Sequence, residues 1–476
     1  MSDLTAEQKA AVESKAEWTS IVAPPGSGKT HTLVARVEHL IERAQDPRKM
    51  VIVTFTRKAA AELNERLPRR PWAHLGTLHG LAMKSRKDQK LAIASEKEMI
   101  EACATVAKAH DKPIIEVARA SRDPQGTLTK MLERSVVEHL EDKGLISMDR
   151  VLTEFAEQEH DFECMLVDEV QDASAVDWKI YSQARNLTVV GDPNQAIYYF
   201  RGGSAENWRR AYKRNREKTT VYALTTNFRS GHKVVEGANA MMGTSMVALK
   251  EAPRGFFGVK RVDTDKEEWD LISGSIKRRE PDKTTMVLCR TNAQADDARV
   301  QLGARGVKIA TLAKEPSKLA IALAYCHERP HSHQAAKMLA LAKKQKLTSQ
   351  LPTVEEIMEG LGEQWPVTRE TVARAAPKPY QDQLMNPDLS TIEVIEEEAV
   401  EQAGVQVMTI HKAKGKQCDY VFVPGATDRR FSDRDDEDGR VLFVAITRAR
   451  RGCAITSAKR EGNKPTTAQR WAKSEE

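Results

Sequence analysis

A glycine-rich segment near the N-terminus has the residue types that bind the phosphates of a nucleotide. It reads APPGSGKT and matches the pattern G-x-x-x-x-G-K-[ST], except that Ala23 replaces the first glycine. That glycine matters less than Gly28, because the tight curvature of such a loop lies nearer its end. Lys29 would reach the outer phosphates and Thr30 could ligate Mg²⁺. A glycine turn without a ligand is the alternative for this loop alone. The expected nucleotide-binding residues of the loop are Ala23, Pro24, Pro25, Gly26, Ser27, Gly28, Lys29 and Thr30.

Two adjacent carboxylates supply the second half of such a site. Asp168 and Glu169 directly follow the apolar run Cys164–Val167. A strand of this kind delivers polar residues to the carboxyl edge of a parallel sheet. Asp168 would hold Mg²⁺, directly or through water, and Glu169 would activate the attacking water. An acidic surface turn is the alternative for this pair alone.

The elements around the loop are those that a phosphate site needs. Residues 19–22 form an expected strand before the loop, and a helix is expected after it. The helix is indicated by apolar residues at helical spacing, so one of its faces should be buried. These residues are Leu33, Val34, Val37, Leu40 and Ile41. A strand, a glycine-rich turn and a helix N-terminus together favour anion binding.

The composition favours a soluble protein of about three structural units. The chain has 476 residues, of which 40% are hydrophobic and 30% charged, with a formal net charge of +6. No run approaches the ~18 uninterrupted apolar residues of a membrane span. The first residues, MSDLTAEQKA, lack an apolar signal core, so a cytoplasmic location is expected. Six cysteines without a C-x-x-C pair suit a reducing compartment. The small positive charge is compatible with a polyanionic partner.

A series of motifs in order resembles the UvrD/Rep family of superfamily 1 helicases. The resemblance spans residues 4–450, nearly the whole chain, and residues 190–202 (VGDPNQAIYYFRG) carry its most specific match. Besides the phosphate loop and the carboxylate pair, the matching segments are Leu4, Thr5 and Gln8, residues 54–63 (TFTRKAAAEL), 76–80 (GTLHG), 190–202, 227–230 (NFRS), 409–415 (TIHKAKG) and 444–450 (VAITRAR).

The resemblance implies an α/β fold with two RecA-like P-loop NTPase domains, each with an inserted, mainly helical subdomain. The first motor core would comprise residues 1–84 and 161–215, with residues 85–160 as its insertion. The second would comprise residues 216–310 and 400–476 and include the apolar run at 286–288. Its insertion, residues 311–399, is shorter than in most family members.

For ATP chemistry, the resemblance assigns roles to residues on both cores. Gln8 would read adenine and Phe228 would stack on it, and Gln195 would sense the γ-phosphate or orient water. Arg229 and Arg448 would be arginine fingers on transition-state charge, for which a surface salt bridge is the ordinary alternative. Gly415 and Gln417 are also expected near the nucleotide. Gln417 could bond a ribose hydroxyl, although Lys416-Gln417 stands where the family usually has Leu-Glu. The implied cofactors are ATP and Mg²⁺, and the expected catalytic residues are Lys29, Glu169, Gln195, Arg229 and Arg448.

For the strand path, the resemblance implies aromatic stacking and polar contacts to the backbone. Stacking of bases on aromatic rings tolerates any sequence, as a stepping motor requires. Core packing is the alternative for Phe55 and Phe200, and a satisfied structural histidine is the alternative for His79. The expected DNA-binding residues are Phe55, Thr77, His79, Tyr198, Phe200, Arg201, Thr409 and His411.

The expected activity is an ATP-dependent DNA helicase or translocase that moves 3′ to 5′ on single-stranded DNA and unwinds duplex. Expected partners are single-stranded DNA and single/double-strand junctions, with no membrane. The alternatives are a translocase that displaces bound proteins with little unwinding, and a single-strand-binding module without catalysis. RNA is not distinguished from DNA, because stacking and phosphate contacts do not register a 2′-hydroxyl.

Two further segments are expected to be solvated. The cluster Cys326, His327, His331 and His333 matches no strong zinc pattern and is read as a loop. The acidic run at 433–438 is expected to be an exposed loop.

Overall fold

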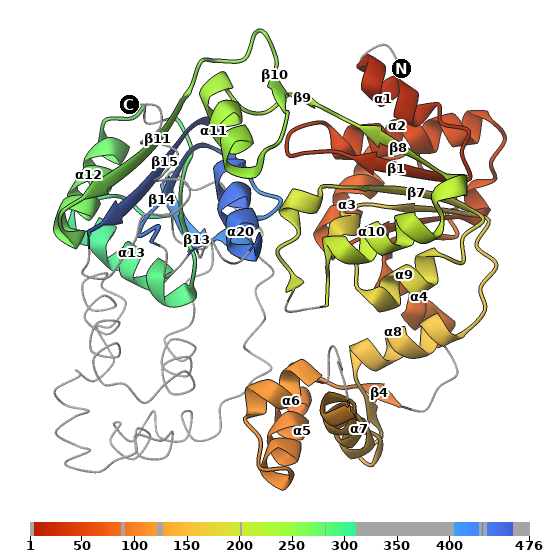
Figure 1. Ribbon diagram of the computed structural model, residues 1–476. Helices are drawn as coiled ribbons and strands as arrows, with labels where there is room; N and C mark the ends of the chain where they lie inside the picture. Colours follow the sequence, from red (N-terminus) through yellow and green to blue (C-terminus); the bar gives the residue numbers. More distant parts are fainter. Residues whose placement is uncertain are drawn as a thin grey trace. The chain divides into compact units, whose positions relative to one another are not determined.

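The computed structural model describes residues 4–86, 91–120, 127–199, 202–280, 282–310, 404–427, 431 and 436–459. Its helices and strands are labelled in Figure 1. Contacts between residues divide the chain into two compact units. The first comprises Met1–Glu268, Leu288–Arg290 and Thr409–Glu476, and the second comprises Trp269–Val287 and Thr291–Met408. Four groups of residues discussed above lie outside the described residues: the Cys/His cluster at 326–333, the second insertion, Phe200 and Arg201. Within those residues, no helix is both long and apolar enough to cross a membrane.

A six-stranded parallel sheet carries the phosphate loop. Its strand order is β3-β2-β6-β7-β1-β8, in which chain neighbours such as β1 and β2 are not spatial neighbours, as expected of crossover connections through helices. The strands are β1 (Trp18–Val22), β2 (Met50–Thr54), β3 (His74–Thr77), β6 (Cys164–Val167), β7 (Asn186–Gly191) and β8 (Thr219–Ala223).

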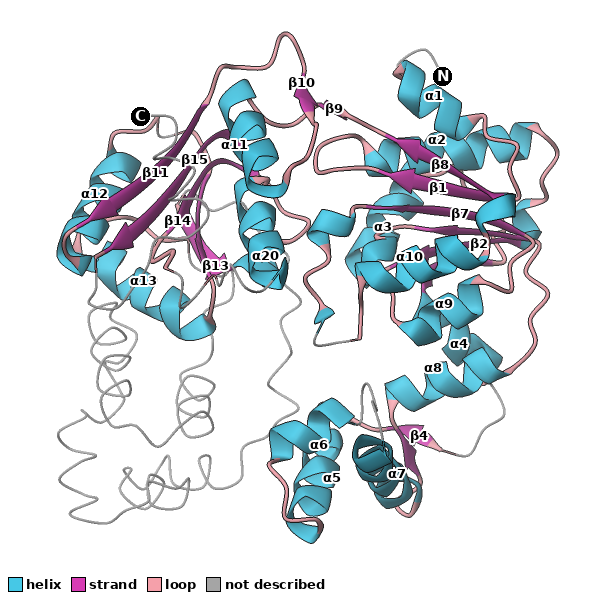
Figure 2. Ribbon diagram, in the orientation of Figure 1, coloured by secondary structure: helices cyan, strands magenta, loops and turns pink. Residues whose placement is uncertain are grey.

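Alternating side chains of this sheet enter two different cores, because successive strand residues point to opposite faces. In β2, Met50 and Ile52 join one core, while Val51 and Val53 join the other. Helices therefore cover both faces (Figure 2). They are α1 (Ala6–Val12), α2 (Lys29–Glu42), α3 (Arg57–Arg66), α4 (Leu78–Ser85), α9 (Ala175–Tyr181) and α10 (Ala205–Arg214).

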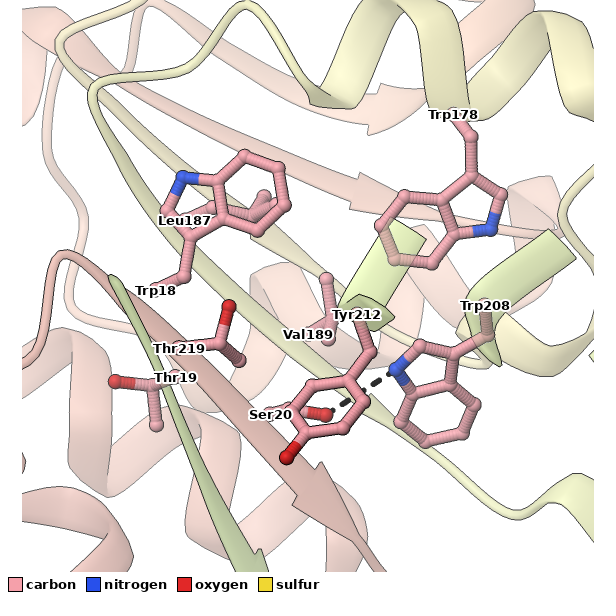
Figure 3. A pocket seen from close by; sticks show the side chains of 9 residues that line it. All are labelled: Trp18, Thr19, Ser20, Trp178, Leu187, Val189, Trp208, Tyr212 and Thr219. Carbon is pink, nitrogen blue, oxygen red and sulfur yellow. Dashed lines mark hydrogen bonds between the residues drawn. The ribbon is translucent and has the colours of Figure 1, made fainter. Parts of the chain in front are cut away.

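Three tryptophan side chains pack at the end of the sheet where β1 and β7 begin, opposite the phosphate loop. Trp18, Trp178 and Trp208 surround the starts of β1 and β7 (Figure 3). The indole Nε1 of Trp208 donates to the Ser20 hydroxyl at 3.1 Å, so the buried ring has its polar group satisfied. This end of the sheet is packed core. The phosphate loop and the other functional loops follow the opposite ends of the strands.

Residues 92–146 form a mainly helical region with its own small core. Its helices are α5 (Glu96–Ala109), α6 (Ile114–Ala120) and α7 (Thr127–Glu141), and its two short parallel strands are β4 (Ala92–Ile93) and β5 (Leu145–Ile146). The next helix, α8 (Met148–Glu157), buries its apolar face in a core of the first sheet instead. Ala102, Val106, Leu132 and Val136 are buried at helical spacing and pack together. The expectation of a mainly helical first insertion is confirmed.

A second sheet has the strand order β11-β15-β14-β12-β13, and the described pairings of β15 with β11 and with β14 are parallel. Its strands are β11 (Phe256–Val262), β12 (Thr285–Cys289), β13 (Val405–Thr409), β14 (Cys418–Val423) and β15 (Ala449–Ala458). The helices in this part of the sequence are α11 (His232–Met242), α12 (Asp265–Lys277), α13 (Asn292–Ala304), α19 (Ile410–Ala413) and α20 (Asp436–Ile446). A short pair of strands, β9 (Thr226–Asn227) and β10 (Val247–Ala248), precedes β11 in the sequence. The α/β class with two parallel P-loop-type sheets is confirmed.

The acidic run at 433–438 differs from its expectation. Its last part is helical, because α20 begins at Asp436. Asp438, whose side chain is 13% exposed, accepts a hydrogen bond from the Arg290 guanidinium at 2.9 Å. The expectation of an exposed loop is wrong there, since a partner distant in sequence neutralises the carboxylate.

Candidate active site

The phosphate loop joins β1 to α2 through two glycines with left-handed backbone. Gly26 has φ +76° and Gly28 has φ +81°, a region that side chains rarely adopt. A Cβ on Gly28 would lie 2.7 Å from the Gln8 Nε2, and one on Gly26 would lie 2.8 Å from the Arg229 Cβ. Ala23 is fully buried and is not among the described residues with positive φ, so alanine replaces the usual first glycine without backbone strain.

Gln8 is fixed against this loop by its own helix cap. Thr5 and Gln8 form a capping box at the start of α1, in which the Gln8 Oε1 accepts from the Thr5 backbone N–H. The Gln8 Nε2 then donates to the Ser27 carbonyl at 3.0 Å. With one acceptor and one donor of the amide used locally, the Gln8 side chain is held in a single orientation beside the loop.

Lys29 lies at the start of α2 and folds back over the loop. Its Nζ donates to the Ala23 carbonyl at 2.7 Å. Burial lowers the pKa of Lys29, while Glu169, Asp192 and Asp168 oppose that shift. The three carboxylates thus favour the charged form of Lys29, while burial disfavours it. Thr30 follows in the first turn of α2 and is half-buried.

The two carboxylates leave β6 with a strained turn. The Asp168 backbone N–H donates to the Val53 carbonyl at 2.9 Å, and Glu169 has φ +52°, which is rare for a residue other than glycine. Such a conformation costs ~1–3 kcal/mol and persists only where the surroundings enforce it. Burial, with the neighbouring Glu169 charge, raises the pKa of Asp168. Burial alone would raise the pKa of Glu169, yet the charges of Lys29 and Lys414 hold that pKa below its ordinary value.

Arg448 is buried and joins the C-terminal part of the chain to Gln195. Its Nη2 donates to the Gln195 Oε1 at 3.0 Å, and its Nε donates to the Val444 carbonyl at 3.0 Å. The Gln195 Nε2 in turn donates to the Asp192 carboxylate at 2.9 Å. Burial, with Arg229, lowers the pKa of Arg448 to about 9. All of these residues belong to the first compact unit.

Arg229 and Phe228 are held beside the loop by Asn227. The Asn227 Nδ2 donates to the Pro25 carbonyl at 2.8 Å, and its Oδ1 accepts from the Arg229 backbone N–H at 2.9 Å. The Phe228 backbone N–H donates to the Gly26 carbonyl at 2.8 Å, while the Phe228 side chain is 43% exposed. Its ring is thus anchored by the backbone and open to a stacking partner.

Two expected nucleotide residues lie in a turn far from the loop in the sequence. Gly415 and Gln417 are exposed in the turn after α19. The hydrogen bonds of the described residues link neither of them to residues 23–30. Their proximity to a nucleotide stays a prediction.

Aromatic residues expected on the strand path do meet. The rings of Phe55 and Tyr198 stack with centroids 5.3 Å apart and planes 17° apart, and both residues are half-buried. The His411 ring lies 6.2 Å from the Tyr198 ring, and burial lowers the pKa of His411. Thr77 and Thr409 cap the helices that follow them, since their hydroxyls accept from the backbone N–H groups of Gly80 and Lys412.

The sequence analysis missed an ion pair that lies between the expected hydrolysis residues and the expected strand path. The Lys414 Nζ is hydrogen-bonded to the Asp172 carboxylate and donates to the Gln195 carbonyl at 2.8 Å. The same Nζ lies 4.8 Å from the centroid of the Tyr198 ring, within cation–π range. Asp172 is 3% exposed, and burial raises its pKa to about 7. Both residues lie inside matched motifs (VDEVQD and TIHKAKG), which was the signal available in the sequence.

Two parts of the chain match known protein families, and the chain is similar to several named helicases. Residues 8–201 match the family described as the AAA domain, and residues 333–460 match the family described as the UvrD-like helicase C-terminal domain. The chain is 22% identical to the ATP-dependent DNA helicase PcrA of Staphylococcus aureus, over 96% of this chain and 83% of that protein. It is 25% identical to the ATP-dependent DNA helicase UvrD1 of Mycobacterium leprae, over 60% of this chain and 44% of that protein. A PcrA of Leuconostoc citreum is 27% identical over 61% of this chain and 47% of that protein. The first family match contains Lys29, Glu169 and Gln195, and the second contains Arg448.

Proposed function

We propose that the chain, which belongs to the UvrD/Rep-like family of superfamily 1 ATP-dependent DNA helicases, moves 3′ to 5′ along single-stranded DNA and unwinds duplex. The observation that carries the proposal is the hydrogen bond between Arg448 and Gln195. It connects a residue of the C-terminal family match to one of the AAA match. Transition-state charge in phosphoryl transfer is stabilised by an arginine in this kind of position.

In the proposed hydrolysis, Lys29 and the loop N–H groups hold the phosphates, and Glu169 takes a proton from the attacking water. Gln195 orients that water, since its amide is already fixed by Asp192 and Arg448. Arg229 and Arg448 meet the charge that develops on the γ-phosphate. The low pKa of Glu169 keeps it anionic near neutral pH, which a proton acceptor requires.

The donor set at the loop fits Mg²⁺. The Thr30 hydroxyl and the Asp168 carboxylate are hard oxygen ligands, and such a site usually has one or two carboxylates together with phosphate oxygens. The described residues contain no group of three or more His, Cys, Asp or Glu side chains that could hold a metal without a nucleotide. When bound with ATP, Mg²⁺ would neutralise charge on the outer phosphates.

The proposed movement along DNA requires the two motor cores to close around ATP and to open again when the products of hydrolysis are released. We assign the motor cores to residues 1–84 with 161–215 and to residues 216–310 with 400–476, with insertions at 85–160 and 311–399. Phe55, Tyr198 and His411 are proposed to contact the strand, together with Thr77, His79 and Thr409. The contact of Lys414 with both Gln195 and Tyr198 supports coupling between hydrolysis and this strand path.

Strand displacement with tailed duplexes tests the proposal. We expect ATP-dependent unwinding of a 3′-tailed duplex and little of a 5′-tailed or blunt duplex, with Lys29→Ala as the inactive control. Displacement of a bound protein without unwinding would instead support a translocase. Strand binding by a protein without ATPase activity would leave only a binding module and refute the proposal.

A further inference from the structure

A surface groove lies beside helix α3, at the edge of the first sheet. It is an open depression of about 510 Å³, and it is bordered on one side by α3 and on the other by β3 and the segment that leads into it. Strand β3 is at the end of the strand order, so the groove is at a free edge of the sheet. Among its lining residues are Ala60, Ala61, Asn64, Arg70, Trp72 and Leu75.

The groove lies along one face of α3, and this face begins near Phe55 on the expected strand path. Ala60, Ala61 and Asn64 follow Arg57 at i+3, i+4 and i+7, so these four residues share a helix face. Arg57 comes two residues after Phe55, whose ring stacks on Tyr198. At 1.5 Å per residue, the face from residue 57 to 64 is about 10 Å long. Roughly three nucleotides of a stacked strand, at ~3.4 Å each, span this distance.

The charges around the groove suit a polyanion. Residues 57–70 contain five basic side chains and two acidic ones. Among the hydrogen bonds and ion pairs of the described residues, none pairs the side chains of Arg57, Lys58, Arg66, Arg69 or Arg70 with a carboxylate, and all five residues are exposed. Arg70 lines the groove and Arg57 shares its helix face, so these two charges are available to a ligand there, whereas Arg66 lies nine residues after Arg57, on the opposite face of α3.

Trp72 gives the groove a stacking surface. It is half-buried and packs on one side against the core beneath α3. Ala60 and Ala61 have no side chain beyond Cβ, so they leave a hollow beside the lining indole. Stacking on an indole requires an unpaired base, and base–aromatic stacking is independent of sequence.

We propose that this groove binds a further segment of single-stranded DNA, continuous with the segment at Phe55 and Tyr198. One base stacks on Trp72, and Arg70 and Arg57 bind the adjacent phosphates. The inference rests on the proposed action on single-stranded DNA, and it extends the strand contacts beyond those that the family motifs imply.

Fluorescence anisotropy with oligo-dT of two lengths tests the groove. An oligonucleotide of roughly 4 residues would cover little more than the Phe55 site, while one of roughly 20 would also fill the groove, which continues for roughly three further nucleotides. We expect Arg70→Ala to weaken binding of the long oligonucleotide only, and to lower its salt slope by about 0.7. We expect Trp72→Leu to weaken it at least about fivefold, with Trp72→Phe restoring most of the affinity.

Arg66→Ala is the matched control, because it removes the same charge from α3 off the groove face. Equal affinities of wild type and Arg70→Ala for the long oligonucleotide would overturn the groove proposal. So would an equal loss on a blunt duplex, which would indicate a general phosphate site. If wild-type protein bound neither oligonucleotide, the proposed function itself would fail, which is a different result.

Discussion

Replacement of Arg448 by alanine should separate ATP binding from hydrolysis. The guanidinium is 2% exposed and donates to the Gln195 Oε1, the Val444 carbonyl and the Lys416 carbonyl. An arginine finger contributes about 10³–10⁵ to the hydrolysis rate. At 1.36 kcal/mol per tenfold, this is about 4–7 kcal/mol of transition-state stabilisation. ATP affinity should stay near wild type, because Lys29 and the loop amides hold the ground state.

The assay is single-turnover hydrolysis at saturating DNA, measured together with nucleotide affinity. Arg448→Lys should rescue little, since one ammonium group cannot reproduce donors that point to four acceptors, of which the Thr447 hydroxyl is the fourth. Each buried acceptor left unpaired costs ~1–3 kcal/mol, so thermal melting must show that the variants are folded. Arg451→Ala is the control, because that side chain is 44% exposed and pairs only at 3.5 Å with Asp419. Wild-type turnover in folded Arg448→Ala would refute the role given to this arginine.

Three other results are expected. ATPase activity should rise strongly with oligo-dT, because strand contacts at Tyr198 connect through a lysine to the hydrolysis residues; steady-state rates that are equal with and without DNA would contradict this coupling. Lys29→Ala should abolish hydrolysis but keep strand affinity within a few-fold in nucleotide-free anisotropy, and a large loss of DNA binding in a folded variant would mean that the sites are misplaced. Ala23→Gly should leave ATP affinity unchanged, whereas Gly28→Ala should weaken it, because the new Cβ would lie 2.7 Å from the Gln8 amide nitrogen and the backbone there has a left-handed φ. Nucleotide titration measures both affinities, and comparable values in the two variants would argue against a strained loop.

The sequence predicted well what depends on local pattern. The loop, the strand that precedes it and the apolar face of the next helix are each set by a few consecutive residues, and the structure has β1 and α2 there. The carboxylate pair follows β6 for the same reason. The positive φ of Glu169 was not foreseen, because ordinary preferences disfavour it and only the surrounding structure enforces it.

Contacts between distant segments could not be read from the pattern. Asn227 bonds the Pro25 carbonyl across 202 positions, and Lys414 pairs with Asp172 across 242. The motifs containing these residues were recognised, yet roles went to their neighbours Arg229 and His411. Which member of a motif faces a partner depends on how two elements pack, and periodicity within one element carries no information about that.

The position of Lys414 explains how one side chain could serve both halves of a motor. It bonds the carbonyl of Gln195, whose side chain contacts Arg448, and it lies over the ring of Tyr198. Its other partner, Asp172, is buried, so the ion pair cannot be replaced by water without the cost of an unpaired buried charge. A base that stacked beside Tyr198 would change the environment of the ammonium group, and any shift of that group would move the backbone that positions Gln195. In the proposed mechanism, strand occupancy and water orientation are therefore connected through a single buried cation rather than through a long chain of contacts.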